Sequence, residues 1–153
     1  MSNRDLIRMT DAEIEAFLQE QRTMSIATIA RDGRPHLVAM WYAFLDGVPC
    51  FWTFAKSQKV VNLRRDPRIT AMVEAGDTYT ELRGVEIIAR AEITGDADEV
   101  LRFGIEEFER YQGLTMTEAL LPGIKKMAAK RVVVKLRIER IVSWDHCKLG
   151  GRY

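Results

Sequence analysis

The residues best suited to chemistry lie where an aromatic segment, residues 51–54, runs into a polar one. Lys56, Ser57 and Lys59 follow directly, and the apolar spacing after Ser57 predicts that a helix begins there. The first backbone N–H groups of a helix lack intrahelical acceptors, and the helix dipole is positive at this end. Two lysines and a serine at such a position favour binding of a phosphate. We therefore predict an anion site at this helix start.

Three arginines extend the positive charge beyond this segment. Residues 56–68 contain five basic side chains and one acidic side chain, Asp66. Arg64, Arg65 and Arg68 have two interpretations, a solvated helix face or a track for a long anionic ligand. A nucleic-acid partner is a further alternative, which the formal net charge of +1 disfavours.

Helical and alternating patterns predict the elements that must position these residues. Thr10 and Glu13 have the spacing of a capping box, and apolar residues follow on one face, which predicts a helix over residues 10–21. Further helices are expected over residues 57–65, from residue 96 to about residue 111, and over residues 117–130. Strands are expected over residues 24–30, 36–45, 48–54, 69–75, 85–94 and 132–144.

These elements predict a mainly β protein with helices (α+β), built as a small antiparallel barrel. Asp-Gly pairs at residues 32–33 and 46–47 would connect the first three strands as hairpins. The strand over residues 36–45 is almost continuously apolar, which predicts that both of its faces are covered. No G-x-G-x-x-G motif occurs, and strands and helices do not alternate as in a dinucleotide-binding fold.

Length and composition favour one globular domain in a reducing compartment. The chain has 153 residues, of which 47% are hydrophobic and 29% charged. No apolar run approaches the roughly 20 residues of a membrane span, and the first ten residues lack the core of a signal peptide. We therefore expect a cytoplasmic protein without a membrane span. Cys50, Cys147, His36 and His146 fit no zinc spacing, so no metal site is expected.

Other polar and aromatic residues receive structural interpretations. Three aromatic residues after residue 96 are expected to pack in the core: Phe103, Phe108 and Tyr111. Three glutamates among them are expected on a solvated face: Glu106, Glu107 and Glu109. His146 and Cys147 are interpreted as an incidental polar tail.

The segment that starts at Phe51 also resembles a known family. It reads F-x-T-x-x-x-S-x-K, followed by N-L and D-P, and the chain closes with V-x-W-D-x-x-K-L-G-G. This combination is similar to the pyridoxamine 5'-phosphate oxidase-like flavin split barrels, and the tail is similar to their actinobacterial branch that uses the deazaflavin coenzyme F420. The resemblance covers about residues 23–148 and implies a six-stranded antiparallel split β-barrel of the FMN-binding type. The single domain would span residues 1–153, with an N-terminal helix (1–22), barrel and helices (23–148) and a tail (149–153).

The resemblance implies a cofactor site shared by two protomers of a homodimer. The strand 37–42 would lay its backbone along the flavin-like ring, and Trp52 and Thr53 would contact the ring and ribityl chain. Gln58 and Lys59 would hold the phosphate, with Lys56 and Ser57 beside them. The segment 79–83 and Lys148 would come from the partner chain. The implied cofactor-binding residues are Leu37, Val38, Ala39, Met40, Trp41, Tyr42, Trp52, Thr53, Lys56, Ser57, Gln58, Lys59, Tyr79, Arg83 and Lys148.

One departure from the family pattern affects the expected reaction. Tyr42 stands where the classical oxidases place a lysine for their substrate phosphate, so pyridoxamine phosphate oxidation is not expected. The expected function is an oxidoreductase that transfers a hydride from reduced F420 to a small unsaturated organic substrate. The alternatives are an FMN-binding oxidase or flavin reductase, and a non-enzymatic flavin or haem module. The accompanying proton has three candidate sources: solvent, Tyr42 and His36.

Overall fold

The computed structural model describes residues 3–150 of the chain. Residues 1 and 2 of the predicted N-terminal segment and residues 151–153 of the predicted tail lie outside the described part. The helices are α1 (Asn3–Leu6), α2 (Asp11–Glu20), α3 (Gln58–Arg65), α4 (Ala97–Gln112) and α5 (Leu121–Ala128), with short 3-10 helices η1 (Tyr79–Glu81) and η2 (His146–Leu149). The strands are β1 (Thr23–Ile29), β2 (Pro35–Trp41), β3 (Ala43–Leu45), β4 (Val48–Phe54), β5 (Arg68–Ala75), β6 (Arg83–Thr94) and β7 (Arg131–Asp145).

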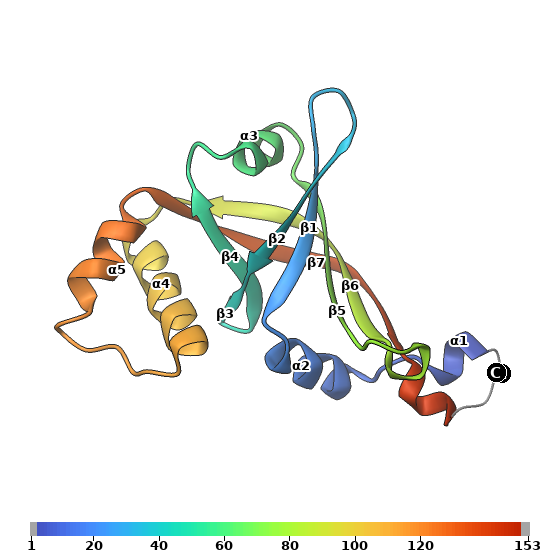
Figure 1. The fold of residues 1–153 in the computed structure, drawn as a ribbon. Helices are drawn as coiled ribbons and strands as arrows, with labels where there is room; N and C mark the ends of the chain where they lie inside the picture. Colours follow the sequence, from blue (N-terminus) through green and yellow to red (C-terminus); the bar gives the residue numbers. More distant parts are fainter. Residues whose placement is uncertain (1–2, 151–153) are drawn as a thin grey trace.

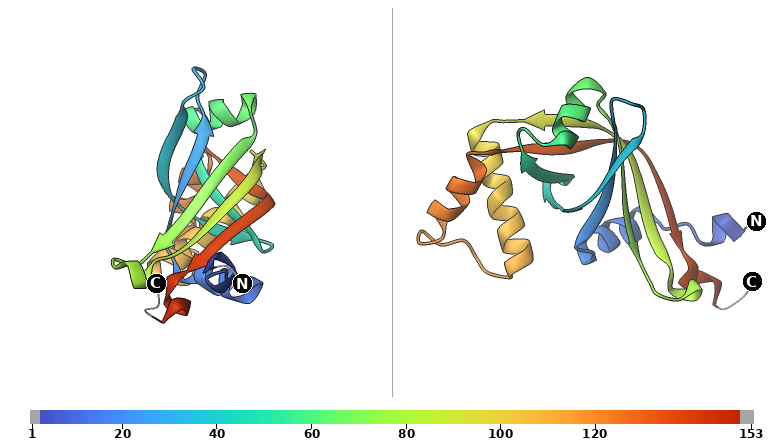
Figure 2. Two further views of the ribbon diagram at one scale, coloured as in Figure 1. Left: turned by 90° about the vertical axis from the view of Figure 1, so that its right-hand side faces the viewer. Right: turned by 45° about the horizontal axis from the view of Figure 1, so that its top comes forward.

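One curled antiparallel sheet contains all seven strands, in the order β2-β1-β5-β6-β7-β4-β3 (Figure 1). β2 and β3 form its two edges although only Tyr42 separates them in the sequence. The sheet must therefore curl until its edges meet at Tyr42, which gives the half-open barrel of Figure 2. The expected split-barrel class is confirmed, but the expected count of six strands is one too low.

The additional strand arises because the predicted strand 36–45 breaks at Tyr42. The Tyr42 N–H donates to the Tyr111 hydroxyl at 3.0 Å, and the one proton of this hydroxyl is shared between the carbonyl oxygens of Tyr42, at 2.9 Å, and Arg22. A side chain of α4 thus takes the place of a neighbouring strand for both backbone groups. The chain can leave one sheet edge here and begin the other.

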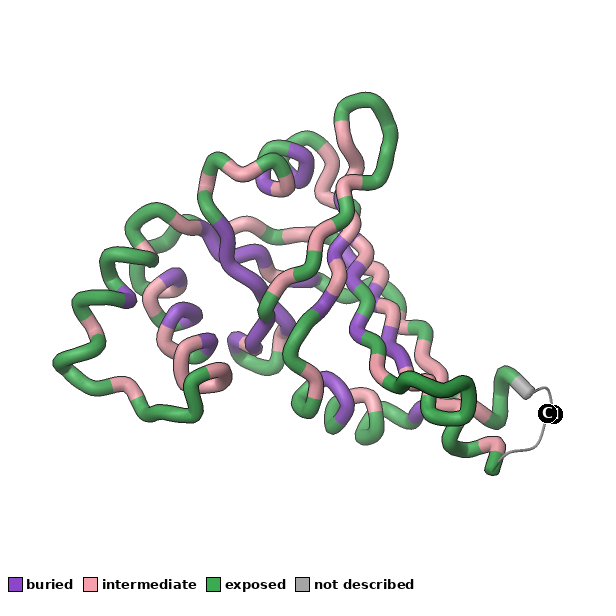
Figure 3. The backbone as a smooth tube through the Cα atoms, in the orientation of Figure 1, coloured by how far each residue is buried: buried purple, intermediate pink, exposed green. Residues whose placement is uncertain are grey.

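Two hydrophobic clusters lie on opposite faces of β4. Phe51 points into the barrel beside Ile26 and Leu136, whereas Cys50 and Trp52 point outward against α4. β4 is therefore buried on both faces, which Figure 3 shows as a purple segment.

β2 lacks the two-sided cover that its apolar sequence predicts. Its residues alternate between exposed and half-buried, and Leu37 is 69% exposed. The prediction is wrong for this chain because β2 is an edge strand with only β1 beside it. The apolar outer face is present in the sequence, and α4 covers its Trp41 end through the stacked ring of Tyr111, whereas Leu37 stays exposed.

Helices occupy both ends of the sheet. α4 and α5 lie together at one end, and α1, η1 and η2 lie at the other (Figures 1 and 2). The predicted capping box of α2 is confirmed, since Thr10 accepts from the Glu13 N–H and the Glu13 carboxylate accepts from the Thr10 N–H. No described helix is long and apolar enough to cross a membrane.

Candidate functional site

The α3 start brings together several of the residues expected to bind phosphate. Ser57 is the N-cap residue with extended backbone angles, and its hydroxyl accepts from Thr53 Oγ1 at 3.3 Å instead of capping the helix. Lys59 Nζ donates to Thr53 Oγ1 at 3.2 Å. The end of β4 therefore fixes a hydroxyl pair and an ammonium group beside the first turn of α3.

Lys59 is a half-buried cation without a carboxylate partner. Burial lowers the pKa of its ammonium group. Among residues 3–150, no ion pair joins Lys59 or Lys56 to an acidic side chain, and Lys56 is exposed. A desolvated cation beside free helix N–H groups is stabilised by an anion, so these residues fit a phosphate.

A buried polar chain positions this helix start and was not recognised in the sequence. Gln58 Nε2 donates to Asn62 Oδ1 at 2.9 Å, and Asn62 Nδ2 donates to Thr28 Oγ1 at 3.1 Å. Asn62 and Thr28 are 0% and 1% exposed. These side-chain hydrogen bonds tie α3 to β1. The asparagine of the N-L motif was the only feature of the sequence that could have indicated them.

The three arginines beyond Lys59 do not all extend the anion site. Arg68 pairs with Asp66 at 2.7 Å, and this pairing holds the pKa of the Asp66 carboxyl at about 2. Arg65 donates to the carbonyl of Ile29. Arg64 is exposed. The structure therefore favours the solvated-surface interpretation for Arg65 and Arg68.

The predicted ring-contacting strand presents an unpaired edge. Leu37, Ala39 and Trp41 point to its exposed face, whereas Val38 and Met40 are half-buried and pack against the barrel core. β2 pairs with β1 alone, so its other backbone edge has no strand partner in the sheet. This edge is compatible with the predicted contact to a planar ring.

Tyr42 has a structural position, and its interpretation as a proton source is wrong. It is 1% exposed, and its hydroxyl donates to the carbonyl of Leu18 at 2.6 Å and lies 3.1 Å from that of Gln21. Burial raises the pKa of Tyr42 to about 12. A buried hydroxyl bonded to backbone of the same chain does not reach a substrate.

His36 is another candidate proton source, but its Nδ1 atom is buried, so this role stays a prediction. Its side chain is half-buried on β2, opposite Thr28. Within the described part of the chain, no hydrogen-bond partner meets its Nδ1 atom.

Trp52 and Thr53 point to opposite faces of β4, so they do not form one patch. Trp52 is 6% exposed and lines a cavity of about 370 Å³ together with Trp41 and residues of α4 and α5. Glu107 of α4 also lines this cavity and is only 8% exposed, so its expected position on a solvated face is wrong. Its spacing from Val100, Phe103 and Tyr111 places it on the apolar face of the helix, a signal that was present in the sequence.

Tyr79, Arg83 and Lys148 lie far from α3, at the end of the sheet that carries η1 and η2 (Figure 1). Arg83 pairs with Glu20 at 3.1 Å, and Lys148 pairs with Glu13 at 2.6 Å. One chain therefore does not assemble these residues with Lys59. Their predicted role in cofactor binding requires that a second chain supplies them. Arg83 and Lys148 would then have to exchange Glu20 and Glu13 for the cofactor.

His146 and Cys147 do not form a reactive centre. His146 Nδ1 lies 3.0 Å from the Tyr79 carbonyl oxygen, and the two rings are in edge contact at 4.5 Å. Asp145 beside Cys147 raises the pKa of this thiol, which favours its unreactive form.

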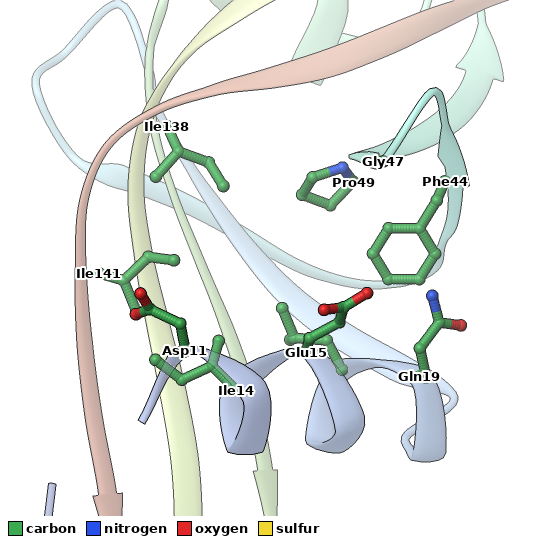
Figure 4. A pocket seen from close by; sticks show the side chains of 10 residues that line it. Asp11, Ile14, Glu15, Gln19, Phe44, Gly47, Pro49, Ile138 and Ile141 are labelled. Atoms are coloured by element: carbon green, nitrogen blue, oxygen red, sulfur yellow. The ribbon is translucent and has the colours of Figure 1, made fainter. Parts of the chain in front are cut away.

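A separate cavity of about 400 Å³ lies between α2, the β3–β4 turn and β7 (Figure 4). Its apolar lining includes Ile14, Phe44 and Ile138. The charged residues in this lining are Asp11 and Glu15, so it is unsuited to a phosphate-bearing ligand.

Comparisons with known proteins support the split-barrel fold. A crystal structure of a conserved hypothetical protein of Mycobacterium tuberculosis is 46% identical, with a TM-score of 0.93, over 100% of this chain and 95% of that chain. An F420H(2)-dependent biliverdin reductase of M. tuberculosis is 26% identical over 137 residues, 88% of each chain. A solved F420 reductase is 29% identical, with a TM-score of 0.65, over 83% of this chain and 94% of that one. The profile of the pyridoxamine 5'-phosphate oxidase family matches residues 10–145, nearly the whole length, and the chain belongs to this family.

Proposed function

We propose that this protein is an F420-dependent reductase that transfers a hydride from the reduced deazaflavin to a small unsaturated organic substrate. The observation that carries the proposal is the half-buried, carboxylate-free Lys59 at the start of α3. Two relatives whose names include F420 support the proposal, one similar in sequence over 88% of this chain and one similar in structure over 83% of it. The proposal includes a cytoplasmic setting, in which Cys50 and Cys147 stay free thiols.

The residues present fit such a cofactor. Lys59, Ser57 and the first N–H groups of α3 would hold its phosphate, with Gln58 fixed by Asn62. The backbone edge of β2 and the Trp41 side chain would border its ring. When bound, the reduced deazaflavin supplies the hydride, and the protein orients the ring edge and excludes water from it.

A second copy of the chain completes the proposed site. Trp41, Met72 and Val142 share the outer face of the sheet through the pairs Thr23–Trp41, Ser25–Met72, Met72–Glu86 and Glu86–Val142. These three side chains are 51%, 40% and 39% exposed. Thr23, Ser25 and Glu86 lie between these apolar side chains on the same face, so the proposed homodimer interface would be mixed apolar and polar. Burying it in a homodimer would bring the partner's end of the sheet toward β2.

The test is a side-by-side fluorescence titration of the cofactor-free protein with F420 and with FMN. Micromolar or tighter F420 binding, with FMN at least tenfold weaker, would support the proposal. The reverse order would assign the protein to the FMN-binding members of the fold, and binding of neither would refute both assignments.

The variant Lys59→Ala tests the phosphate position. Loss of a charged hydrogen bond should weaken F420 binding by about 1 to 3 kcal/mol, or roughly 5- to 150-fold. Lys126→Ala, which removes an exposed lysine from α5, is the matched control and should leave binding unchanged. Unchanged affinity in folded Lys59→Ala would exclude the assigned phosphate site.

A further inference from the structure

The cavity beside Trp41 and Trp52 has features that the phosphate site does not use. It lies between α4, α5 and the aromatic residues of β2 and β4, and its volume of about 370 Å³ lies within the range of small-molecule sites. Its lining is mainly apolar. Representative lining residues are Trp41, Trp52, Glu107, Phe108, Tyr111 and Met127.

Aromatic rings give the cavity flat walls. The Trp41 ring stacks on Tyr111 with centroids 4.4 Å apart and an interplanar angle of 9°. The Trp52 ring packs against Gly104, where an added Cβ atom would lie 2.8 Å from it. Both indoles are therefore held in place, and they favour a planar ligand.

Glu107 supplies a titratable group within this apolar lining. Burial raises the pKa of its carboxyl to about 7, against the opposing effects of a hydrogen bond from the Trp52 side chain and the charge of Arg131. Tyr111 is a second titratable residue of the lining, from the same helix, and α5 contributes none to it. Lys125 of α5 lines a different cavity. Below neutral pH, the carboxyl of Glu107 is mainly protonated and can donate a hydrogen bond.

The apolar lining favours an uncharged ligand. An anionic ligand would meet apolar walls and a carboxyl group that ionises near neutrality. A cationic ligand would lose its hydration against the same apolar walls, where Glu107 is uncharged when protonated. A neutral carbonyl oxygen can accept the Glu107 proton in a hydrogen bond without either penalty.

We propose that this cavity binds an uncharged, planar, conjugated carbonyl compound and that the protonated Glu107 carboxyl donates a hydrogen bond to its carbonyl oxygen. The assignment of this compound as the substrate class rests on the proposed reductase function. Trp41 lies both in this cavity and on β2, the strand predicted to border the cofactor ring. A conjugated carbonyl held there would present an electrophilic carbon next to that strand.

The test uses cofactor-free protein and the neutral enone 4-phenylbut-3-en-2-one as the probe. Binding is followed by tryptophan fluorescence and by calorimetry between pH 6 and pH 8.5. Affinity should fall at least tenfold across this range, because Glu107 loses its proton. Cinnamate, an anion with nearly the same skeleton, and the hydrocarbon β-methylstyrene should each bind at least tenfold more weakly than the enone at pH 6.

Variants at one position separate hydrogen bonding from packing. Glu107→Gln keeps an N–H donor at every pH, so its affinity should be nearly independent of pH. Glu107→Leu removes the donor and should bind weakly throughout. Glu106→Gln, on the exposed face of the same helix, should retain the wild-type pH profile. If Glu107→Leu does not fold, the pH profile of Glu107→Gln decides whether the Glu107 carboxyl donates a hydrogen bond to the ligand.

Three results would overturn the inference: pH-independent binding by the wild type, full affinity in folded Glu107→Leu, or tighter binding of the cation 4-phenylbutan-2-amine. F420 binding to the same samples is measured separately, through the fluorescence of the deazaflavin itself. Enone binding without F420 binding would retain the site and refute the reductase function. F420 binding without enone binding would refute the site alone.

Discussion

Replacing Glu107 by glutamine should change how the stability of the protein depends on pH. Folding raises the pKa of this carboxyl from 4.5 to about 7, so the folded protein holds a proton that the unfolded chain releases. The resulting contribution to stability is complete below pH 4.5 and is lost as pH rises to about 7. At 1.36 kcal/mol for each pKa unit, the loss amounts to about 3 kcal/mol.

Glutamine cannot ionise, so the variant should lack this loss. Urea unfolding, followed by circular dichroism at fixed protein concentration from pH 5 to pH 8, measures the free energy of unfolding of both proteins. The difference between variant and wild type should shift by about 2 to 3 kcal/mol in favour of the variant as pH rises. Other titrating groups contribute equally to both proteins and cancel.

Glu106→Gln is the control, because this side chain on the same helix is exposed. It should leave the pH dependence unchanged. A parallel pH dependence of wild type and Glu107→Gln would refute the argument, since it would mean that the carboxyl of Glu107 ionises equally easily in the folded and unfolded chains.

Three further substitutions test the elements that support the site. Asn62→Leu should lower the free energy of unfolding by about 1 to 3 kcal/mol in urea titrations and weaken F420 binding, because it leaves the buried Thr28 hydroxyl without its donor. Gly104→Ala should cost about 1 to 3 kcal/mol and alter the near-ultraviolet circular dichroism of Trp52, because the new Cβ atom overlaps its ring. Tyr111→Phe should cost about 1 kcal/mol or more and speed amide hydrogen exchange at the β2–β3 junction, because this hydroxyl bonds both backbone groups there. Wild-type stability in any of these variants would contradict the role given to that residue.

Local sequence patterns predicted those helices and strands whose formation depends mainly on nearby residues. The alternation over residues 85–94 predicted most of β6, and the spacing of Thr10 and Glu13 predicted the start of α2. Propensity and periodicity act over a few residues, so these elements need little tertiary information.

The break at Tyr42 could not be predicted in the same way. It depends on the Tyr111 hydroxyl, which is 69 positions away in the sequence. The predicted cover on both faces of β2 failed for a related reason. An apolar sequence indicates that a surface is buried, but it does not indicate which chain covers that surface.

The candidate site was predicted in part. The residue types around Lys59 predicted an anion site. The structure shows that Lys59 and Ser57 both bond to Thr53, and anion binding there stays a prediction. Glu107 was misinterpreted because its neighbours Glu106 and Glu109 suggested a solvated face, whereas the 3.6-residue period places it with the apolar residues.

The position of α4 and α5 in the chain has an evolutionary consequence. Both helices are inserted between β6 and β7, which pair directly with each other, so the hydrogen-bond ladder of the barrel does not run through them. The anion site at the start of α3 lies on a different connection. Selection can therefore remodel residues 97–130, and with them one wall of the cavity, while the turn proposed to bind phosphate stays constant. If the two proposed sites are correct, a protein built this way can change the compounds it accepts without changing the residues that hold its cofactor.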